Sequence, residues 1–252
     1  MRLHVGASTS AGQLRADNQD FLLYRIASLE PDAARDCSLF VAADGVGGAA
    51  GGAIASEVTA ETIAARFPRR GGADPAAAMI RAIRAAERAV AERASVDPAL
   101  SEMATTLVVA VVRDNTLLMA NVGDSRGYLI RGSEARRITE DHSFVEEEVR
   151  AGRMSAAAAA VSPYRHVITR SINGVDEDVE VDIFGPLPLE LGDRILLCTD
   201  GLTETMADDE IAGLAQPDDA EAAAQALVDE ANRRGGPDNV SVLLVAVVDE
   251  DR

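Results

Sequence analysis

Four aspartates stand beside apolar runs of strand length, and this recurring arrangement constrains the fold more than any other feature of the sequence. They are Asp44 after residues 39–43, Asp124 after residues 117–122, Asp200 after residues 195–199, and Asp238 before residues 240–245. A carboxylate at the end of a buried strand needs a positive partner, because an unpaired buried charge is costly. Four such carboxylates, supplied by distant parts of the chain, predict one metal centre where several strands end.

The stretch around Asp44 also predicts its own local structure. Glycines at positions 45, 47 and 48 follow the aspartate, and residues 49–67 have the small-residue composition of a helix. Glycine lets the backbone turn sharply and approach a ligand closely. We therefore expect a strand, a turn and a helix, with the peptide groups of the turn open to a ligand.

Length and composition indicate a globular protein with a sizeable core. The chain has 252 residues, of which 47% are hydrophobic and only 3% aromatic. A core built from Ala, Val, Leu and Ile is expected. Neither an internal repeat nor a linker is visible, so residues 1–252 are expected to form a single domain.

Charge and cysteine content restrict the partners and the location. The formal net charge of -18 argues against nucleic acid and anionic membranes as partners, since both require positive surface. Lysine is absent, so every basic role falls to arginine. Cys37 and Cys198 lie in or beside apolar runs, as structural thiols of a reduced cytoplasmic protein do. Residues 1–10 lack the apolar segment of a signal peptide, and no run reaches the roughly 20 apolar residues of a membrane helix. We expect a soluble, cytoplasmic monomer.

Hydrophobic periodicity and turn residues predict an α+β fold with largely antiparallel sheets. Strands are expected at residues 3–8, 20–26, 38–43, 105–112, 116–122, 127–131, 136–138, 179–184, 193–199 and 240–248. Asp114 and Asn115 tolerate left-handed backbone geometry, which predicts a hairpin between the strands on either side of them. Residues 127–131 are expected to continue the sheet of that hairpin. Residues 185–188, which include two prolines, are expected to separate two later strands.

Two long helices are predicted by their caps. Asp74 followed by Pro75 is a typical helix start. The last helix is capped by Asp218 or Asp219 and ends at residues 233–236, where two arginines precede two glycines.

Residues 143–163 differ in composition from the segments around them. A run of glutamates is followed by Gly152 between two arginines, and then by five alanines. This composition favours helix but demands little burial, and segments with few apolar contacts open at low cost. We therefore expect residues 143–163 to form a mobile flap.

Six short motifs occur in a fixed order along the chain. They are Arg-Ala-Asp-Asn-Gln-Asp at 15–20, Asp-Gly-Val-Gly-Gly at 44–48, Gly-Asp-Ser-Arg at 123–126, Asp-His-Ser at 141–143, Thr-Asp-Gly at 199–201, and Gly-Pro-Asp-Asn at 236–239. Each motif is weak alone, but the ordered set resembles the metal-dependent protein phosphatase family, the type 2C serine/threonine phosphatases, in its compact bacterial form. The resemblance runs from about residue 6 to residue 248. It implies a four-layer α-β-β-α sandwich, in which two mainly antiparallel sheets are flanked by helices.

The resemblance also implies a set of metal ligands. Asp44 would bridge two Mn²⁺ or Mg²⁺ ions, and the Gly45 carbonyl would ligate one of them. Asp200 and Asp238 would complete the coordination of the first ion, and Asp20 would hold metal-bound water.

Further residues of the motifs would support this centre. Asp124, together with Asp200, matches a third metal site of bacterial members of the family. Arg15 would clamp the substrate phosphate. Gln19 and Asn239 would lie behind the ligands and orient them.

The implied activity is hydrolysis of phosphoserine and phosphothreonine in proteins, the products of a cognate kinase, by attack of a metal-bridging hydroxide. The residue types agree with this chemistry. Hard divalent cations prefer carboxylate, carbonyl and water oxygens, and the sequence offers no His or Cys cluster for zinc. Two ions about 4 Å apart generate a hydroxide at neutral pH, and the planar fork of Arg matches two phosphate oxygens.

Two positions depart from the pattern of the family. Some relatives, notably eukaryotic ones, carry a histidine after the Asp-Gly pair that protonates the leaving group, and here the residue is Val46. Gln19 stands where many relatives have glutamate, which removes one charge beside the second ion. His142 and His166 have no matched partner in the sequence and are interpreted as structural.

Two other functions are compatible with parts of the sequence. Residues 45–50 satisfy the pattern G-x-G-x-x-A after a strand, which is typical of dinucleotide-dependent oxidoreductases. Asp44 would then point its charge at the pyrophosphate, and a second helix follows where a second parallel strand is required. The other function is that of a catalytically weak phosphatase fold, which serves as a binding or regulatory module and is permitted by Val46 and Gln19.

Overall fold

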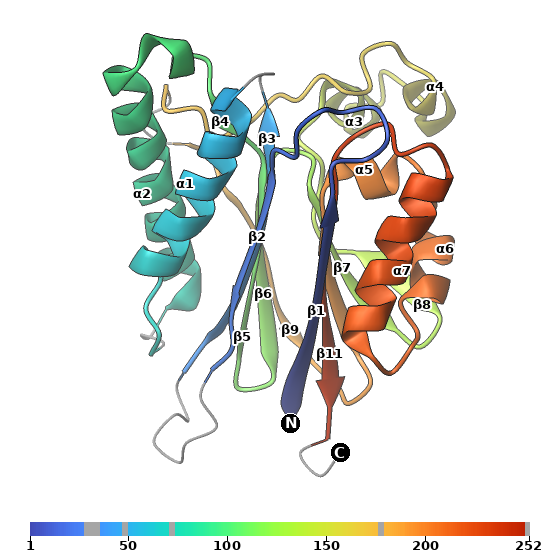
Figure 1. Cartoon of the computed structure of the whole chain (residues 1–252). Helices are drawn as coiled ribbons and strands as arrows, with labels where there is room; N and C mark the ends of the chain where they lie inside the picture. The colour runs from blue at the N-terminus through green and yellow to red at the C-terminus, as the bar shows by residue number, and fades with distance from the viewer. Residues whose placement is uncertain (28–35, 47–49, 71–73, 176–178, 250–252) are drawn as a thin grey trace.

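Two antiparallel sheets are stacked face to face in the computed structural model of the protein, which describes residues 1–27, 36–46, 50–70, 74–175 and 179–249 (Figure 1). The first, called the β11 sheet, has the strand order β1 (Arg2–Ser10), β11 (Val240–Val248), β10 (Arg194–Cys198), β7 (Arg126–Arg131) and β8 (Glu134–Arg137). The second, called the β3 sheet, has the order β2 (Asp20–Arg25), β3 (Ser38–Val46), β5 (Leu107–Arg113), β6 (Thr116–Val122) and β9 (Asp182–Pro188). The short β4 (Ala104–Thr105) pairs with β3 off this path.

Helices cover the outer faces of both sheets, which confirms the predicted four-layer α-β-β-α sandwich (Figure 1). The helices over the β3 sheet are α1 (Ala50–Arg66) and α2 (Pro75–Val96), followed by the 3-10 turn η2 (Pro98–Leu100). Those over the β11 sheet are α5 (Asp200–Thr203), α6 (Asp208–Leu214) and α7 (Ala220–Arg233). The remaining two, α3 (Phe144–Arg150) and α4 (Ala156–Ala160), lie beside one end of the sandwich. None of the helices in the described ranges has the length and apolar character needed to span a membrane.

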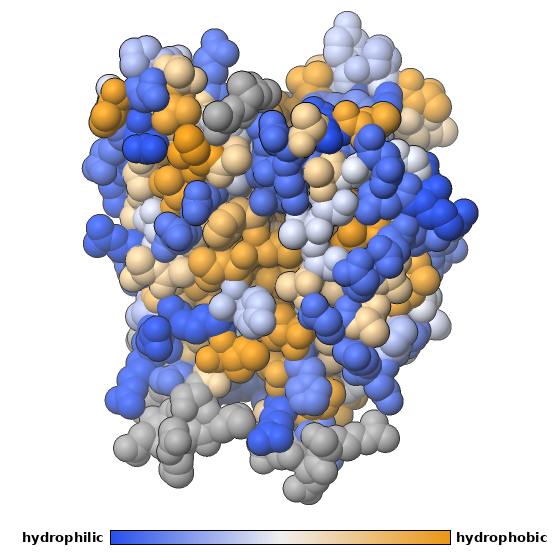
Figure 2. Space-filling model, viewed as in Figure 1, coloured by the Kyte–Doolittle hydropathy of each residue, from blue (hydrophilic) through white to orange (hydrophobic). Residues whose placement is uncertain are grey.

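Three hydrophobic layers hold the sandwich together. Phe40, Met119, Leu197 and Val245 are among the side chains buried between the two sheets. Separate clusters join each sheet to its helices. Burying each large aliphatic side chain contributes about 1.5–3 kcal/mol to the free energy of unfolding, so the core does not depend on aromatic residues. Figure 2 shows hydrophobic residues along the middle of one face, where the edge strands β1 and β2 come to the surface between the helix layers.

Local signals in the sequence predicted the long helices and the central hairpin correctly. The Asp74 side chain accepts a hydrogen bond from the Ala77 N–H at 2.9 Å and caps α2. Asp219, and not Asp218, caps α7. Asp114 and Asn115 have φ angles of 50° and 58°, the left-handed geometry of the predicted hairpin turn.

Two predictions about the sheets are wrong. Residues 127–131 do not continue the sheet of the hairpin, because β7 crosses to the β11 sheet and pairs with β10 and β8. Residues 185–188 do not separate two strands, since they lie within β9, which begins at Asp182 rather than at residue 179. Proline is tolerated in β9 because this strand is at the edge of its sheet and leaves one side without a partner.

Two further features differ from the expectations, and a third agrees with them. The short helices α5 and α6 were not predicted, because neither has the length for a clear period. The strand at residues 38–43 continues to Val46, so Asp44 lies inside β3. Both cysteines are buried thiols without a disulfide, as expected, and burial raises the pKa of Cys198 to about 12.

Candidate metal centre

The structure brings most of the sequence-predicted site residues to one cavity, at the end of the sandwich opposite the chain termini (Figure 1). This carboxylate cavity has a volume of about 690 Å³. Its lining includes Arg15, Gln19, Asp44, Gly45, Asp124, Asp200, Asp238 and Asn239. Asp20 lies behind the lining, opposite Asp44 in the pairing of β2 with β3.

Asp44 is held by its backbone, which leaves its side chain available. Its carbonyl accepts hydrogen bonds from the Thr106 N–H and the Thr105 hydroxyl, both at 2.8 Å. Burial raises the pKa of Asp44 well above its usual value, and four neighbouring carboxylates raise it further. The folded protein therefore resists charging Asp44 unless a cation is present.

Gly45 lies so close to its neighbours that no side chain fits. A Cβ atom there would stand 2.3 Å from the Gly52 carbonyl oxygen and 2.8 Å from the Gln19 carbonyl oxygen. The Gln19 carbonyl accepts hydrogen bonds from the Gly45 N–H at 3.1 Å and from the Ser56 hydroxyl at 2.6 Å. The end of β3 is thereby fixed against α1 and against the loop after β1.

Asp20 is anchored across the interface of the two sheets. Its Oδ2 accepts a hydrogen bond from the Thr199 hydroxyl at 2.8 Å, and the Thr199 hydroxyl accepts one from the Ser241 N–H at 2.9 Å. Its Oδ1 is buried without a partner among the described residues. Burial raises the pKa of Asp20 to about 6. An orphaned carboxylate oxygen beside Asp44 fits a residue that holds water or a cation.

Arg15 and Asp238 form an ion pair, with 2.5 Å between Arg15 Nη2 and Asp238 Oδ2. The sequence analysis assigned these residues to the phosphate and to a metal ion, respectively, and did not predict the contact. The Arg15 side chain is 55% exposed, and that of Asp238 is 25% exposed. Because the pair lies at the mouth of the cavity, the arginine is free to turn towards a ligand.

Asp200 and Asp124 both line the carboxylate cavity. Asp200 begins α5, and its Oδ1 is buried without a partner among the described residues. Burial raises the pKa of Asp200 well above its usual value, and Asp124 and Glu204 raise it further. Burial likewise raises the pKa of Asp124 to about 6, with a further contribution from Asp141.

His142 fixes the turn that carries Asp124. Its Nδ1 accepts a hydrogen bond from the Gly123 N–H at 3.0 Å, so the ring proton is on Nε2, which lies 3.2 Å from Asp182 Oδ2. The His142 N–H in turn donates to the Gly123 carbonyl at 2.9 Å. Burial lowers the pKa of His142, which keeps the ring neutral. His142 is therefore a positioning residue, in agreement with its sequence interpretation.

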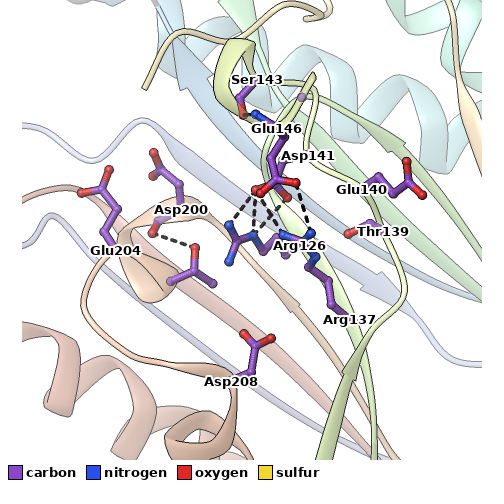
Figure 3. A network of polar contacts seen from close by, with 12 residues as sticks. Arg126, Arg137, Thr139, Glu140, Asp141, Ser143, Glu146, Asp200, Glu204 and Asp208 are labelled. Atoms are coloured by element: carbon purple, nitrogen blue, oxygen red, sulfur yellow. Dashed lines mark hydrogen bonds and ion pairs between the residues drawn. The ribbon is translucent and has the colours of Figure 1, made fainter. Parts of the chain in front are cut away.

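Arg126 and Asp141 form an ion pair (Figure 3) that lines a second cavity, which shares Asp124 and Asp200 with the carboxylate cavity. Arg126 Nε lies 3.0 Å from both Asp141 oxygens, and its Nη2 donates to Asp141 Oδ2 at 2.6 Å. Arg137 approaches the same carboxylate at 3.6 Å. This pairing satisfies Asp141, so its charge is not available to a metal ion. Asp200 and Glu204 line the carboxylate cavity and have no arginine partner among the described residues.

The structure adds two residues that the sequence analysis did not place at the site. His166 Nδ1 lies 2.6 Å from Glu204 Oε1, and the ligand atoms of His166, Glu204 and Asp200 all lie within 4.8 Å of one another. His166 lines the carboxylate cavity, which differs from its interpretation as a structural residue. Glu204 follows Asp200 by four positions, a helical spacing that was available in the sequence. No short sequence pattern around His166 indicated that it would line the cavity.

The residues present fit divalent cations. Oxygen donors dominate, the Oδ1 atoms of Asp20 and Asp200 are orphaned, and the carboxylates raise one another's pKa. Among the described lining residues, Arg15 is the positively charged side chain that pairs directly with one of the predicted metal ligands, Asp238. Hard divalent metal ions would relieve the electrostatic repulsion between these carboxylates.

The antiparallel pairing of the β3 sheet excludes the dinucleotide-binding interpretation for the described part of the chain. β3 pairs with β2, β4 and β5, each time antiparallel, whereas a dinucleotide-binding unit requires parallel neighbours. The glycines at positions 47 and 48, on which that interpretation also rested, lie outside the described residues.

Comparison with known proteins gives matches that cover nearly all of the given chain. The serine/threonine protein phosphatase PstP of Mycobacterium tuberculosis is 34% identical over 249 residues, which cover 99% of the chain but only 46% of PstP. The chain thus spans about half the length of that relative. Protein phosphatase PhpP of Streptococcus pneumoniae is 34% identical over 257 residues, which cover 99% of both proteins.

Solved structures and a family-wide comparison agree. The crystal structure of the PstP phosphatase matches with a TM-score of 0.87 and 32% identity, covering 98% of the chain and 99% of that structure. The PstP catalytic domain in complex with two manganese ions matches with a TM-score of 0.83 and 33% identity, covering 98% and 99%. The sequence profile of Protein phosphatase 2C matches residues 16–243. The chain belongs to the protein phosphatase 2C family.

Proposed function

We propose that this protein is a metal-dependent phosphatase that hydrolyses phosphoserine and phosphothreonine in proteins. The observation that carries the proposal is the carboxylate cavity, where burial and mutual repulsion raise the pKa values of Asp44 and Asp200 well above their usual range. Maintaining such a cluster destabilises the protein unless it binds cations. The manganese complex of the related PstP domain supports the same assignment.

Asp44, Asp200, Asp238 and the Gly45 carbonyl would hold two Mn²⁺ or Mg²⁺ ions, with Asp20 behind them and Asp124 beside a third ion. When bound, such ions supply water activation and the charge neutralisation that phosphate ester hydrolysis needs. The chain itself supplies rigidity, since hydrogen bonds from Thr105, Thr106 and Thr199 fix Asp44 and Asp20. Gln19 and Asn239 contact each other and hold the loop around these ligands.

Arg15 would bind the substrate. Its guanidinium pairs with Asp238 at the cavity mouth, and a phosphate dianion offers the same fork a doubly charged partner. If Asp238 held a cation, Arg15 would lose this partner and its guanidinium would be available to the phosphate. Val46 lines the cavity and has no proton to give, so the chain offers no leaving-group acid at this position.

The names of relatives support this substrate class, since PstP and the Listeria relative stp are named as serine/threonine phosphatases. The substrates would be phosphoproteins made by a cognate kinase. Residues 143–163 would act as a flap that governs access. In support, Ala156, Ala159 and Ala160 line a second cavity of about 560 Å³ together with Asp124 and Asp200.

The test is release of phosphate from an aryl phosphate and from a phosphothreonine peptide, with Mn²⁺, with Mg²⁺ and in excess chelator. We expect activity with either ion and none in chelator. Asp238→Asn should remove nearly all turnover, while Asp209→Asn on the exposed start of α6 serves as the matched control. Metal binding without turnover on either substrate would instead identify a binding module, and full activity in chelator would reject the metal centre.

A further inference from the structure

The outer face of the α1–α2 layer carries a groove that the proposed function does not use. It has a volume of about 520 Å³ and is lined by both helices. Ala82, Ala85 and Ala89 of α2 are buried or half-buried and form its floor. Arg66, Arg81 and Arg88 are exposed and stand around it. We refer to this feature as the arginine groove.

The three arginines have no ionic partner within the described residues. Several other arginines of the molecule pair with carboxylates, as Arg234 does with Glu210 at 2.8 Å. Glu92 also lines the groove, so three positive charges and one negative charge leave it with a net charge of +2. This local excess of positive charge contrasts with the formal net charge of -18 of the chain. It indicates a negatively charged occupant.

Helix geometry indicates the shape of that occupant. Arg81 and Arg88 are seven positions apart on α2, which places them on one side of the helix, two turns and about 10 Å apart. The alanines between them have small side chains, so another backbone can approach α2 closely. Carboxylates two turns apart on a second helix would meet both arginines, while its small apolar residues would rest on the floor.

We propose that the arginine groove binds an acidic, amphipathic helical segment of a partner protein. The three arginines are exposed, so a single inorganic anion would remain largely hydrated beside them. Nucleic acid and a second copy of this chain are disfavoured, because the rest of the surface repels strongly negative molecules. A helical segment needs only local charge complementarity, which the three arginines supply.

Fluorescence anisotropy tests the proposal with a labelled helical peptide of Ala, Leu and Glu, whose glutamates are spaced seven residues apart. We expect the wild-type protein to bind it, and binding to weaken as salt is raised. The double substitution Arg81→Glu with Arg88→Glu should weaken binding by about tenfold or more. The matched control is Arg2→Glu with Arg93→Glu, which makes the same change in net charge outside the groove lining. This control should retain most of the affinity.

Three outcomes would overturn the proposal. They are an absence of peptide binding to the wild type, an equal loss in both double variants, and undiminished binding of a peptide in which glutamine replaces glutamate. Tighter binding of a DNA duplex that depends on Arg81 and Arg88, or a dimer in sedimentation that both charge reversals abolish, would assign the groove to another occupant. Circular dichroism checks that each variant is folded. The double substitution Arg81→Ala with Arg88→Ala serves as a second variant, which removes the two charges without reversing them. Aryl phosphatase activity should be equal in all variants, which separates this result from the proposed function.

Discussion

The side-chain oxygen of Asn239 accepts a hydrogen bond from the backbone N–H of Gln19 at 2.8 Å, across 220 positions of sequence. The Asn239 amide nitrogen donates to the carbonyls of Ala11 at 3.1 Å and Asp17 at 2.9 Å. One buried amide thus binds the whole loop between β1 and β2 to the residue that follows Asp238. The position of that loop relative to the proposed ligands depends on this contact.

Asn239→Ala should therefore loosen the loop and lower both stability and activity. Removing the amide leaves three backbone groups without their partner, at a cost of about 2–4 kcal/mol in the free energy of unfolding. Urea denaturation measures this cost. The control is Gln225→Ala, which removes two outlying hydrogen bonds, one from the Ser8 hydroxyl at 3.0 Å and one to Asp229 at 2.9 Å. Equal effects of the two substitutions would contradict a special role for Asn239.

The protein without cations should become more stable as the pH falls from about 7 towards 5. Folding raises the pKa values of Asp20 and Asp124 from 3.8 to about 6. Between these values the folded state binds protons that the unfolded state has released, so stability falls as the pH rises. Each pKa unit corresponds to at most about 1.4 kcal/mol.

Thermal melting in chelator at several pH values measures this dependence. His142 opposes it, because its pKa is lowered in the folded protein, and the comparison of wild type with Asp20→Asn cancels that contribution. The expected difference is a weaker stabilisation by acid in Asp20→Asn. Identical pH profiles for the two proteins would contradict the prediction.

Arg15→Ala should weaken substrate binding without weakening metal binding. Because Arg15 pairs with Asp238, its removal leaves that carboxylate free for a cation, so the Kd for Mn²⁺ should stay constant or fall. The kcat/KM for a phosphopeptide should fall by about tenfold or more, and Arg15→Lys should restore only part of it, since the fork is lost. Calorimetry and steady-state kinetics measure the two effects. Weaker Mn²⁺ binding with normal kinetics at saturating metal would make Arg15 a structural residue.

Shortening residues 156–160 should alter activity on a phosphoprotein far more than on an aryl phosphate. This segment forms α4 and lines a cavity shared with Asp200, yet few of its side chains are buried. A lid with so little buried area opens at low cost. Metal binding should not change. Equal losses on both substrates would place the segment in the catalytic centre, and hydrogen exchange as slow as that of β11 would exclude a mobile flap.

Much of the architecture could be predicted from the sequence, as could the residue types that now line the carboxylate cavity, because the necessary signals are local. An apolar run of strand length followed by Asp44 and Gly45 marks a strand end, and Asp74 before Pro75 marks a helix start. The ordered motifs then indicated the family. Such signals depend on residues a few positions apart, whose geometry the backbone itself constrains.

Only the tertiary structure decided which distant groups meet. No local sequence pattern predicts that β7 pairs with β10 in the β11 sheet, or that Arg15 contacts Asp238. The same is true of His166, which lies 38 positions before Glu204 and contacts it at 2.6 Å. Periodicity determines which face of an element is apolar, but the partner of that face depends on how all the layers stack. The charge of a side chain is therefore fixed by the sequence, whereas its counter-charge is fixed by the packing of the sandwich.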